Sequence, residues 1–265
     1  MKPHHPGLWS IILYTPYALW MASCFIVVGL LTAVTVIILP GEVNRRRIAR
    51  LGAYGFFAAC GAPPRISGLE NVPEGPAVIV ANHASYLDGV IIQGVLPPRF
   101  GFVIKGEMQS VPLVHMVLRR LGSIFVDRND PRGSSRDAMR IFRQVARGRC
   151  MGFFAEGTFK REPGLRPFKM GAFITAARLG VPVVPVAIRG SRQILPSKSW
   201  WPRWHRLEVE IGEAITAGGR DRSDAIKLRD RARRAILSMI DEPDLEAVHR
   251  ADSTHHEHQA HSRKH

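Results

Sequence analysis

The chain of 265 residues is long enough to bury one good-sized core with an accessory segment. Its formal net charge of +15 and sequence pI near 10.8 require an anionic partner, so nucleic acid, anionic lipid surfaces and phosphorylated substrates are all candidates at this stage. The cysteines Cys24, Cys60 and Cys150 have neither metal-ligand nor redox spacing, which argues against a cysteine-based centre and predicts unpaired thiols in a reducing compartment.

The amino-terminal region is almost wholly apolar from Leu8 to Leu39. One straight helix over that run would be about 48 Å long, well beyond a hydrocarbon core of about 30 Å. Pro16 offers a natural break, after which Tyr17 to Leu39 would span a bilayer, with nearby tyrosines and tryptophans as an interfacial belt. A cleaved signal peptide fits poorly, because the apolar run is too long and no small-residue cleavage site follows it.

Basic residues follow this run and give the expected orientation. Four arginines within residues 45–50 outnumber Lys2 at the other end, so the positive-inside bias places the rest of the chain in the cytoplasm. The next apolar stretch, residues 51–62, is too short to cross and either lies in the interface or begins the globular domain. We therefore expect a transmembrane or interfacial helical anchor over residues 1–62, on the cell (inner) membrane, with the catalytic part of the chain on the cytoplasmic face.

The globular domain is predicted to begin after the turn Gly61–Pro64 and to cover residues 63–241. Short apolar runs alternate there with helical patterns. This alternation predicts an α/β fold, a mixed and mostly parallel sheet flanked by helices. The expected strands cover residues 77–81, 101–104, 123–126, 151–155, 183–188 and 207–211.

A last helix is expected over residues 223–240, ended by Pro243. Residues 242–265 are predicted to form a disordered, solvated tail, in which residues 251–265 contain five histidines. A metal site in the tail is conceivable from its composition, but no surrounding fold constrains it. The side chains of the last helix that should face a core are Ile226, Ile236, Leu237 and Ile240.

The polar segment Asn82–Asp88 directly follows the first expected strand, at the kind of strand end where α/β sheets keep their chemistry. In one continuous helix, positions five residues apart point about 140° from each other. We therefore expect His83 before a helix and Asp88 in its first turn, with Ser85 as the N-cap. Asp88 could then hold one imidazole nitrogen and leave the other to act as a general base. The alternative is that Ser85 and Asp88 only form a capping box.

Three later segments are also notable: two place polar residues directly after an expected strand, and in the third, prolines flank the beginning of a strand. Each alone is weak evidence, because strands often end in polar turns. In chain order, they are the strand end before Arg128, the strand end before Glu156, Gly157 and Thr158, and the proline-bracketed run Val181–Val186.

Taken in this order, the four segments resemble the glycerolipid acyltransferases, the family of 1-acylglycerol-3-phosphate and related lysophospholipid acyltransferases. The resemblance covers residues 65–213, which is essentially the whole predicted globular domain. The four blocks of the family match Asn82, His83 and Asp88; Arg128; Phe154, Glu156, Gly157 and Thr158; and the segment Val181–Pro185. The segment Pro167–Gly171 matches a run that follows the third block in many members.

Two positions depart from the pattern of the family. Ala155 replaces a usual proline, and Phe159 replaces the usual arginine, one of the groups that would hold the acceptor phosphate. Loss of a bidentate cation weakens the case for a small, doubly charged lysophosphatidic acid. Lys105, Lys160 and Arg161 could supply charge in its place.

The resemblance implies that His83 deprotonates the free hydroxyl of a lysolipid, whose oxygen then attacks a thioester, while Asp88 stabilises the imidazolium. It implies no covalent acyl-enzyme, because a thioester is already activated. On the substrate-binding side it places Arg128, Glu156, Gly157, Thr158 and Lys105, and on the acyl-donor side Pro182 and Pro185.

The implied function is a membrane-bound O-acyltransferase that converts 1-acylglycerol-3-phosphate to phosphatidic acid, with acyl-CoA or acyl carrier protein as donor and without a cofactor or metal. Its expected partners are membrane lipid, the lysolipid acceptor and the acyl donor. Two alternatives stay open: another acceptor, such as a lysophospholipid or an amino-acid-linked lysolipid, and a non-catalytic membrane lipid-binding module. A nucleic-acid-binding role is not expected, because the basic chain carries no recognisable binding motif.

Overall fold

The computed structural model describes residues 8–126, 131–197, 199 and 201–247. Its centre is a seven-stranded sheet. The strands are β1 (Arg65–Ser67), β2 (Val78–Ala81), β3 (Phe100–Lys105), β4 (Ile124–Val126), β5 (Cys150–Phe154), β6 (Val183–Arg189) and β7 (Glu208–Ile211).

The order of the strands in the sheet is β1-β7-β6-β2-β5-β3-β4. All neighbours run parallel except β6 and β7, which are antiparallel. This confirms the expected mixed, mostly parallel α/β sheet. The sequence did not predict β1, because this edge strand has only three residues and no apolar run.

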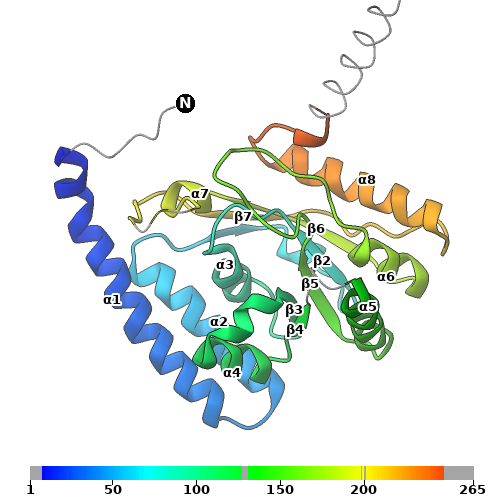
Figure 1. The fold of residues 1–265 in the computed structure, drawn as a ribbon, viewed down its shortest axis with the longest axis horizontal. Coiled ribbons are helices and arrows are strands. Elements are labelled where there is room, and N and C mark those ends of the chain that lie inside the picture. The colour runs from blue at the N-terminus through cyan, green and yellow to red at the C-terminus, as the bar shows by residue number, and fades with distance from the viewer. Residues whose placement is uncertain (1–7, 127–130, 198, 200, 248–265) are drawn as a thin grey trace, which may run out of the picture.

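Helices cover both faces of the sheet (Figure 1). They are α1 (Leu8–Ile38), α2 (Glu42–Ala59), α3 (Asp88–Val95), α4 (Pro112–Arg120), α5 (Pro131–Ala146), α6 (Gly171–Leu179), α7 (Ser191–Ile194) and α8 (Arg222–Met239), with the short 3-10 helices η1 (Leu69–Asn71) and η2 (Gly106–Ser110).

The central strands are apolar on both sides because each face has its own core. In β2, Ile79 and Ala81 pack with residues of α1, α2 and α3, whereas Val78 and Val80 pack with residues of α5, α6 and α8. Successive side chains of a strand point to opposite faces, so a continuous apolar run marks a strand that is buried on both.

The buried face of α8 differs in one position from the expectation. Ala225, Leu228, Ala232 and Ile236 are at most 1% exposed and form its buried stripe, at helical spacing. Ile226, which was expected to face the core, is 36% exposed, because it lies about 100° around the helix from Ala225.

The amino-terminal region forms a helical hairpin in which α1 and α2 lie side by side (Figure 1). The predicted break at Pro16 does not occur, because α1 continues through this residue. A proline removes one backbone hydrogen bond from the helix, and the remaining turns of this 31-residue helix are intact. The two helices approach closely at Gly52, where any larger side chain would overlap Thr32.

Both ends of α1 contact the rest of the molecule. Near its beginning, the guanidinium of Arg203 lies 5.2 Å from the centre of the Tyr14 ring. At its end, Arg120 of α4 donates a hydrogen bond to the carbonyl of Ile37. The helix therefore lies along the domain over most of its length.

The outward side of α1 is exposed and apolar. The segment Tyr14–Ile38 is long and apolar enough to cross a membrane, by length and composition alone. Large side chains on this side are Leu19, Ile26, Val27, Leu30, Leu31, Val34 and Ile38.

Residues 242–247 pack against the domain, although the sequence analysis places them in the tail. Asp244 pairs with Arg233 of α8, and Glu242 pairs with Arg192 of α7. The packed part of the chain thus extends past the expected boundary at residue 241. The rest of the expected tail lies outside the described residues.

The end of β2 is fastened to β6 by a side chain. The amide of Asn82, which is 3% exposed, donates to the carbonyl of Ile188 at 3.0 Å and accepts from its N–H at 2.7 Å. These bonds extend the pairing of β2 with β6 into the turn that carries His83.

We predict that Asn82→Ala lowers the free energy of unfolding by about 1–3 kcal/mol, because it leaves buried backbone groups of Ile188 without partners. Denaturant titration in detergent measures this loss. The exposed Asn44→Ala should stay within about 0.5 kcal/mol of the wild type. An Asn82→Ala variant as stable as Asn44→Ala would contradict the prediction.

Candidate active site

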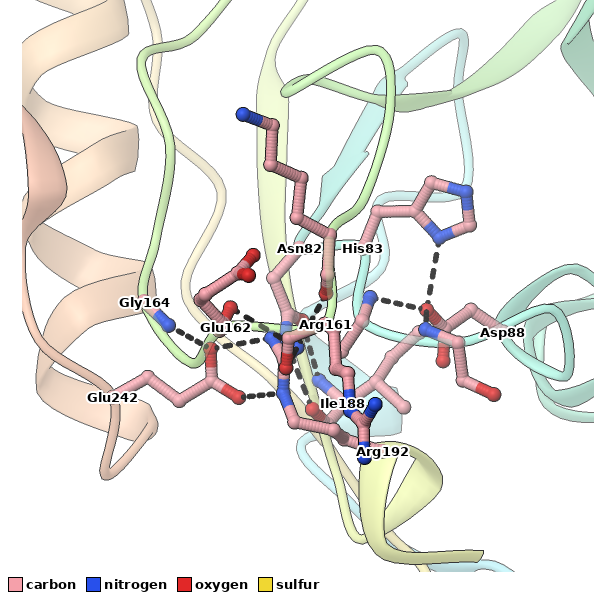
Figure 2. A network of polar contacts seen from close by, with 12 residues as sticks. Asn82, His83, Asp88, Arg161, Glu162, Gly164, Ile188, Arg192 and Glu242 are labelled. Carbon is pink, nitrogen blue, oxygen red and sulfur yellow. Dashed lines mark hydrogen bonds and ion pairs between the residues drawn. The ribbon is translucent and has the colours of Figure 1, made fainter. Parts of the chain in front are cut away.

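The site begins where β2 ends and α3 starts. His83 lies in the turn between them, and Asp88 is the first residue of α3, as the sequence analysis expected. Asp88 is completely buried. Its Oδ2 atom accepts three hydrogen bonds: from Nδ1 of His83 at 2.9 Å, from the N–H of Ala84 at 2.6 Å and from the N–H of Ser85 at 2.8 Å (Figure 2).

This contact fixes the protonation of the imidazole. A buried carboxylate that accepts from Nδ1 keeps the proton on that nitrogen, so Nε2 has a free lone pair. Nε2 points away from Asp88 (Figure 2), and no described residue forms a hydrogen bond with it. The pair can therefore act as a general base and its orienting acid.

The role expected for Ser85 is wrong. Leu87, in a helical conformation, precedes α3, and no side chain caps the helix. The hydroxyl of Ser85 instead accepts from the N–H of Leu87 at 3.2 Å and donates to the carbonyl of Leu195 at 2.8 Å. Ser85 thus braces the turn between His83 and Asp88, and a capping box does not form.

Glu156 follows β5 and lies behind His83. It is 4% exposed, and both of its carboxylate oxygens are occupied by backbone donors. Oε1 accepts from the N–H of His83 at 2.7 Å, and Oε2 accepts from the N–H of Arg166 at 2.9 Å. Glu156 was expected to bind the acceptor, but the structure turns its carboxylate toward the backbone and away from the cavity beside His83.

Burial raises the pKa of the Glu156 carboxyl to about 7, although the two N–H bonds, from Arg166 and His83, act in the opposite direction. A carboxylate without a cation partner is costly to bury, which favours its neutral form. Glu156 therefore holds the backbone of His83 in place with a group that titrates near neutral pH.

Aromatic rings enclose His83. The ring of Phe154 stacks on the imidazole at 4.2 Å between centres, and the ring of Phe159 meets it edge-on at 4.4 Å. Tyr86 in turn packs against Phe159 at 4.7 Å. Phe159 thus places an aromatic ring against His83, at the position where the resemblance to the glycerolipid acyltransferases predicts an arginine.

The contacts of Phe154 with His83 and of Tyr86 with Phe159 were not predicted from the sequence. Phe154 lies in a matched block and Tyr86 in the segment between His83 and Asp88, so proximity to the motifs was the available signal. Aromatic side chains at the end of a buried strand are more often core residues, and periodicity does not separate the two cases.

An apolar cavity of about 620 Å³ lies beside His83, between α1, α2, α3, β3 and α4. Gly157 and Thr158 line it next to His83, and Gly157 has the positive φ of 77° that lets the chain turn there. Cavities of this size bind most of the surface of a small ligand. The amino-terminal helices form part of its wall, so they belong to the site as well as to the anchor.

The remaining expected site residues are placed as follows. Lys105, at the end of β3, lines the cavity and pairs with Glu107 at 2.6 Å. Pro182 directly precedes β6, Pro185 lies within it, and neither lines the cavity. Arg128 lies outside the described residues.

Within the described part of the chain, no group of three or more His, Cys, Asp or Glu side chains could hold a metal ion. The buried thiols of Cys24, Cys60 and Cys150 are free.

Comparison with known proteins gives a consistent picture. Residues 63–189 match the family model described as Acyltransferase. A chloroplastic 1-acyl-sn-glycerol-3-phosphate acyltransferase of Brassica napus is 35% identical over 153 residues, which cover 57% of this chain and 43% of that protein. An enzyme of the same name from Chlamydomonas reinhardtii is 30% identical over 202 residues, 74% of this chain and 59% of that protein. The chain thus spans about half the length of these two relatives.

A bacterial relative matches over more of its length. The 1-acyl-sn-glycerol-3-phosphate acyltransferase of Pseudomonas aeruginosa is 28% identical over 221 residues, 82% of this chain and 85% of that protein. The fold is similar to the crystal structure of the 1-acyl-sn-glycerophosphate (LPA) acyltransferase PlsC from Thermotoga maritima. That likeness has a TM-score of 0.69 at 22% identity and covers 86% of this chain and 95% of the other, so the two share a fold.

The raised pKa of Glu156 predicts a pH dependence of stability. Between about pH 4.5 and 7 the unfolded chain has lost this proton while the folded protein keeps it, so the free energy of unfolding falls as the pH rises through this window. The total loss is on the order of 3 kcal/mol. Glu156→Gln has no such group and should flatten the slope.

Denaturant titrations at several pH values between 4.5 and 7.5 measure this slope, and the exposed Glu70→Gln is the matched control that should keep the slope of the wild type. The assignment would be wrong if Glu156→Gln and the wild type lost stability in parallel over this range.

Proposed function

The chain belongs to the glycerolipid acyltransferase family, and from this premise we propose that it is a membrane-associated O-acyltransferase. It moves a fatty acyl group from a thioester donor to the free hydroxyl of a lysolipid, with no cofactor and no metal. One observation carries the proposal: the 2.9 Å contact between His83 and the buried Asp88, with Nε2 free beside an apolar cavity.

In the proposed reaction, Nε2 of His83 takes the proton of the acceptor hydroxyl as its oxygen attacks the thioester carbonyl. The carbon–sulfur bond breaks, an ester forms, and the imidazolium returns the proton to the departing thiolate. Asp88 stabilises the imidazolium while it exists. A positioned base of this kind contributes about 10²–10⁴ in rate.

We propose that the acyl chain occupies the cavity of about 620 Å³, because its walls are mostly the apolar side chains of α1–α4 and β3. The thioester would then lie at the end of the cavity that His83, Gly157 and Thr158 line. Thr158 and Lys105 can donate hydrogen bonds to an acceptor phosphate there. Arg128 is a further proposed phosphate ligand.

The acceptor that we propose is 1-acylglycerol-3-phosphate, which gives phosphatidic acid. It is the acceptor in the names of the plant, algal and bacterial relatives. Acyl-CoA and acyl carrier protein are the two donor forms that the chemistry allows, because both present a thioester.

We propose that α1 lies in the interface of the cytoplasmic leaflet. If the helix crossed the bilayer, its ends would be about 30 Å apart along the membrane normal. Either Arg203, at the Tyr14 ring, or Arg120, at the Ile37 carbonyl, would then have to enter the hydrocarbon or release its contact. An interfacial helix keeps both contacts and buries the exposed apolar face of α1 in lipid.

One observation favours a second acceptor class. Phe159 occupies the position of the family's phosphate-binding arginine and contacts His83 at 4.4 Å. A ring there gives no charge-assisted bond to a phosphomonoester, so an enzyme for a lysophospholipid or an amino-acid-linked lysolipid is the alternative.

Turnover decides between the enzyme and a non-catalytic lipid-binding module. We expect the purified protein in lipid vesicles to transfer labelled acyl groups from acyl-CoA or acyl carrier protein to at least one lysolipid of a panel. His83→Ala and Asp88→Asn should each lower kcat by about 10²–10⁴-fold, because the base or its orienting acid is lost. The exposed His205→Ala is the control and should keep full activity. An intact fold with no turnover for any acceptor and either donor would refute the proposal.

Phe159→Arg tests the choice of acceptor. A new charge-assisted hydrogen bond to phosphate should raise kcat/KM for lysophosphatidic acid, relative to lysophosphatidylcholine, by about 10–100-fold. Phe159→Leu removes the ring without adding charge and should leave this ratio unchanged. The measurement is the pair of initial-rate curves for each variant. If the ratio were the same in the Arg and Leu variants, residue 159 would not contact the head group.

A further inference from the structure

An ion pair outside the cavity joins the carboxyl-terminal segment to α7. The guanidinium of Arg192 forms a two-pronged contact with Glu242, with Nε to Oε1 at 2.8 Å and Nη2 to Oε2 at 2.9 Å (Figure 2). The Arg192 side chain is 11% exposed and the Glu242 side chain 21%. The two residues are 50 positions apart in the sequence.

The same pair holds the loop between β5 and α6. Nη1 of Arg192 donates to three consecutive carbonyls, those of Lys160 at 2.7 Å and of Arg161 and Glu162 at 3.2 Å. Oε2 of Glu242 accepts from the N–H of Gly164 at 2.8 Å. Two side chains thus bind four backbone groups of one loop (Figure 2).

The inner side of this loop reaches the active site. Phe159 directly precedes the carbonyl that Arg192 holds most tightly, and its ring contacts His83 at 4.4 Å. Farther along the loop, the N–H of Arg166 binds Glu156, which also binds the backbone of His83. The loop has no strand partner over residues 158–164, so these side-chain contacts define its path.

From this arrangement we propose that Arg192 and Glu242 are positioning residues for acyl transfer, a role that rests on the proposed function. The pair holds the loop so that the Phe159 ring lies edge-on against His83, while the Phe154 ring stacks on the imidazole. The imidazole then keeps one orientation, with Nε2 toward the cavity. Through Glu242, the segment of residues 242–247 thereby helps to orient His83, although it does not line the cavity.

The geometry makes arginine necessary at position 192. Its planar, forked donors satisfy a carboxylate and a row of carbonyls at once, whereas the single ammonium of a lysine cannot do both. The pair is also mostly shielded from water, so its contacts are screened less than those of a surface ion pair. Arg192→Lys should therefore keep the charge but release the loop.

The test combines kinetics with chemical labelling of His83. We expect Arg192→Lys and Glu242→Gln to lower kcat by about 10–100-fold, because a displacement of about 1 Å caused by a remote substitution can cost about 10² in rate. The rate at which diethyl pyrocarbonate modifies His83, followed by mass spectrometry, should rise several-fold in both variants. Phe159→Ala should give the same faster labelling of His83. In the double variant Phe159→Ala/Arg192→Lys, the labelling rate and kcat should both equal those of Phe159→Ala alone.

Arg189→Lys is the matched control. Arg189 also binds two carboxylates, Glu208 at 3.1 Å and Glu210 at 2.8 Å, but within the described part of the chain none of its hydrogen bonds or ion pairs reaches the loop. This variant should keep the kcat and the His83 labelling rate of the wild type. Its thermal unfolding measures how much stability is lost when a guanidinium that binds two carboxylates is replaced and the contacts of the loop are left intact.

The labelling result decides the role of the pair by itself. Slow labelling in Arg192→Lys, equal to that of the wild type, would overturn the proposal, as would an additive effect in the Phe159→Ala background. If labelling changes as expected but the wild type acylates no acceptor, the pair positions His83 and the proposed function alone fails.

Discussion

The site depends on one buried carboxylate. Asp88 has lost its contact with water, and its Oδ2 atom accepts from two backbone N–H groups and from the imidazole of His83. A buried charge is tolerated only when it is hydrogen-bonded or paired, and here three donors meet at Oδ2, while Oδ1 has no hydrogen-bond partner among the described residues. The turn between β2 and α3 supplies two of them, so the conformation of the turn and the orientation of His83 are set together.

The surrounding fold holds this turn from several sides. Asn82 ties its beginning to β6, Ser85 ties it to the segment after α7, and Glu156 binds the N–H of His83 from the end of β5. These anchors come from neighbouring strands whose carboxyl ends meet at one edge of the sheet. His83 is thereby fixed through both its backbone and its ring, as a general base requires.

The amino-terminal hairpin serves two purposes in this account. Its inner side, including Phe56 of α2 and Val28 of α1, helps to line the cavity beside His83. Its outer side exposes the apolar residues of α1. In the proposed reaction, a lipid substrate passes from the membrane to His83 without leaving apolar surroundings. The net positive charge of the chain favours its binding to an anionic membrane surface.

The sequence predicted those features that depend on local periodicity. Continuous apolar runs marked β2 and β6 as buried strands, and the spacing of His83 and Asp88 required a turn followed by a helix. Contacts between distant residues left no such pattern. Nothing in the sequence relates Arg192 to Glu242, or turns Glu156 toward the backbone of His83, because side-chain bonds to backbone groups have no periodicity. The continuity of α1 through Pro16 also depends on its packing against α2, which local propensity does not encode.

The tautomer of His83 tests the central claim most directly. Nitrogen-15 NMR of imidazole-labelled protein, at a pH where the ring is neutral, distinguishes the two ring nitrogens. Our account predicts the proton on Nδ1, toward Asp88, and a bare Nε2. A proton found on Nε2 would contradict it, because that nitrogen could then accept no proton from a substrate hydroxyl.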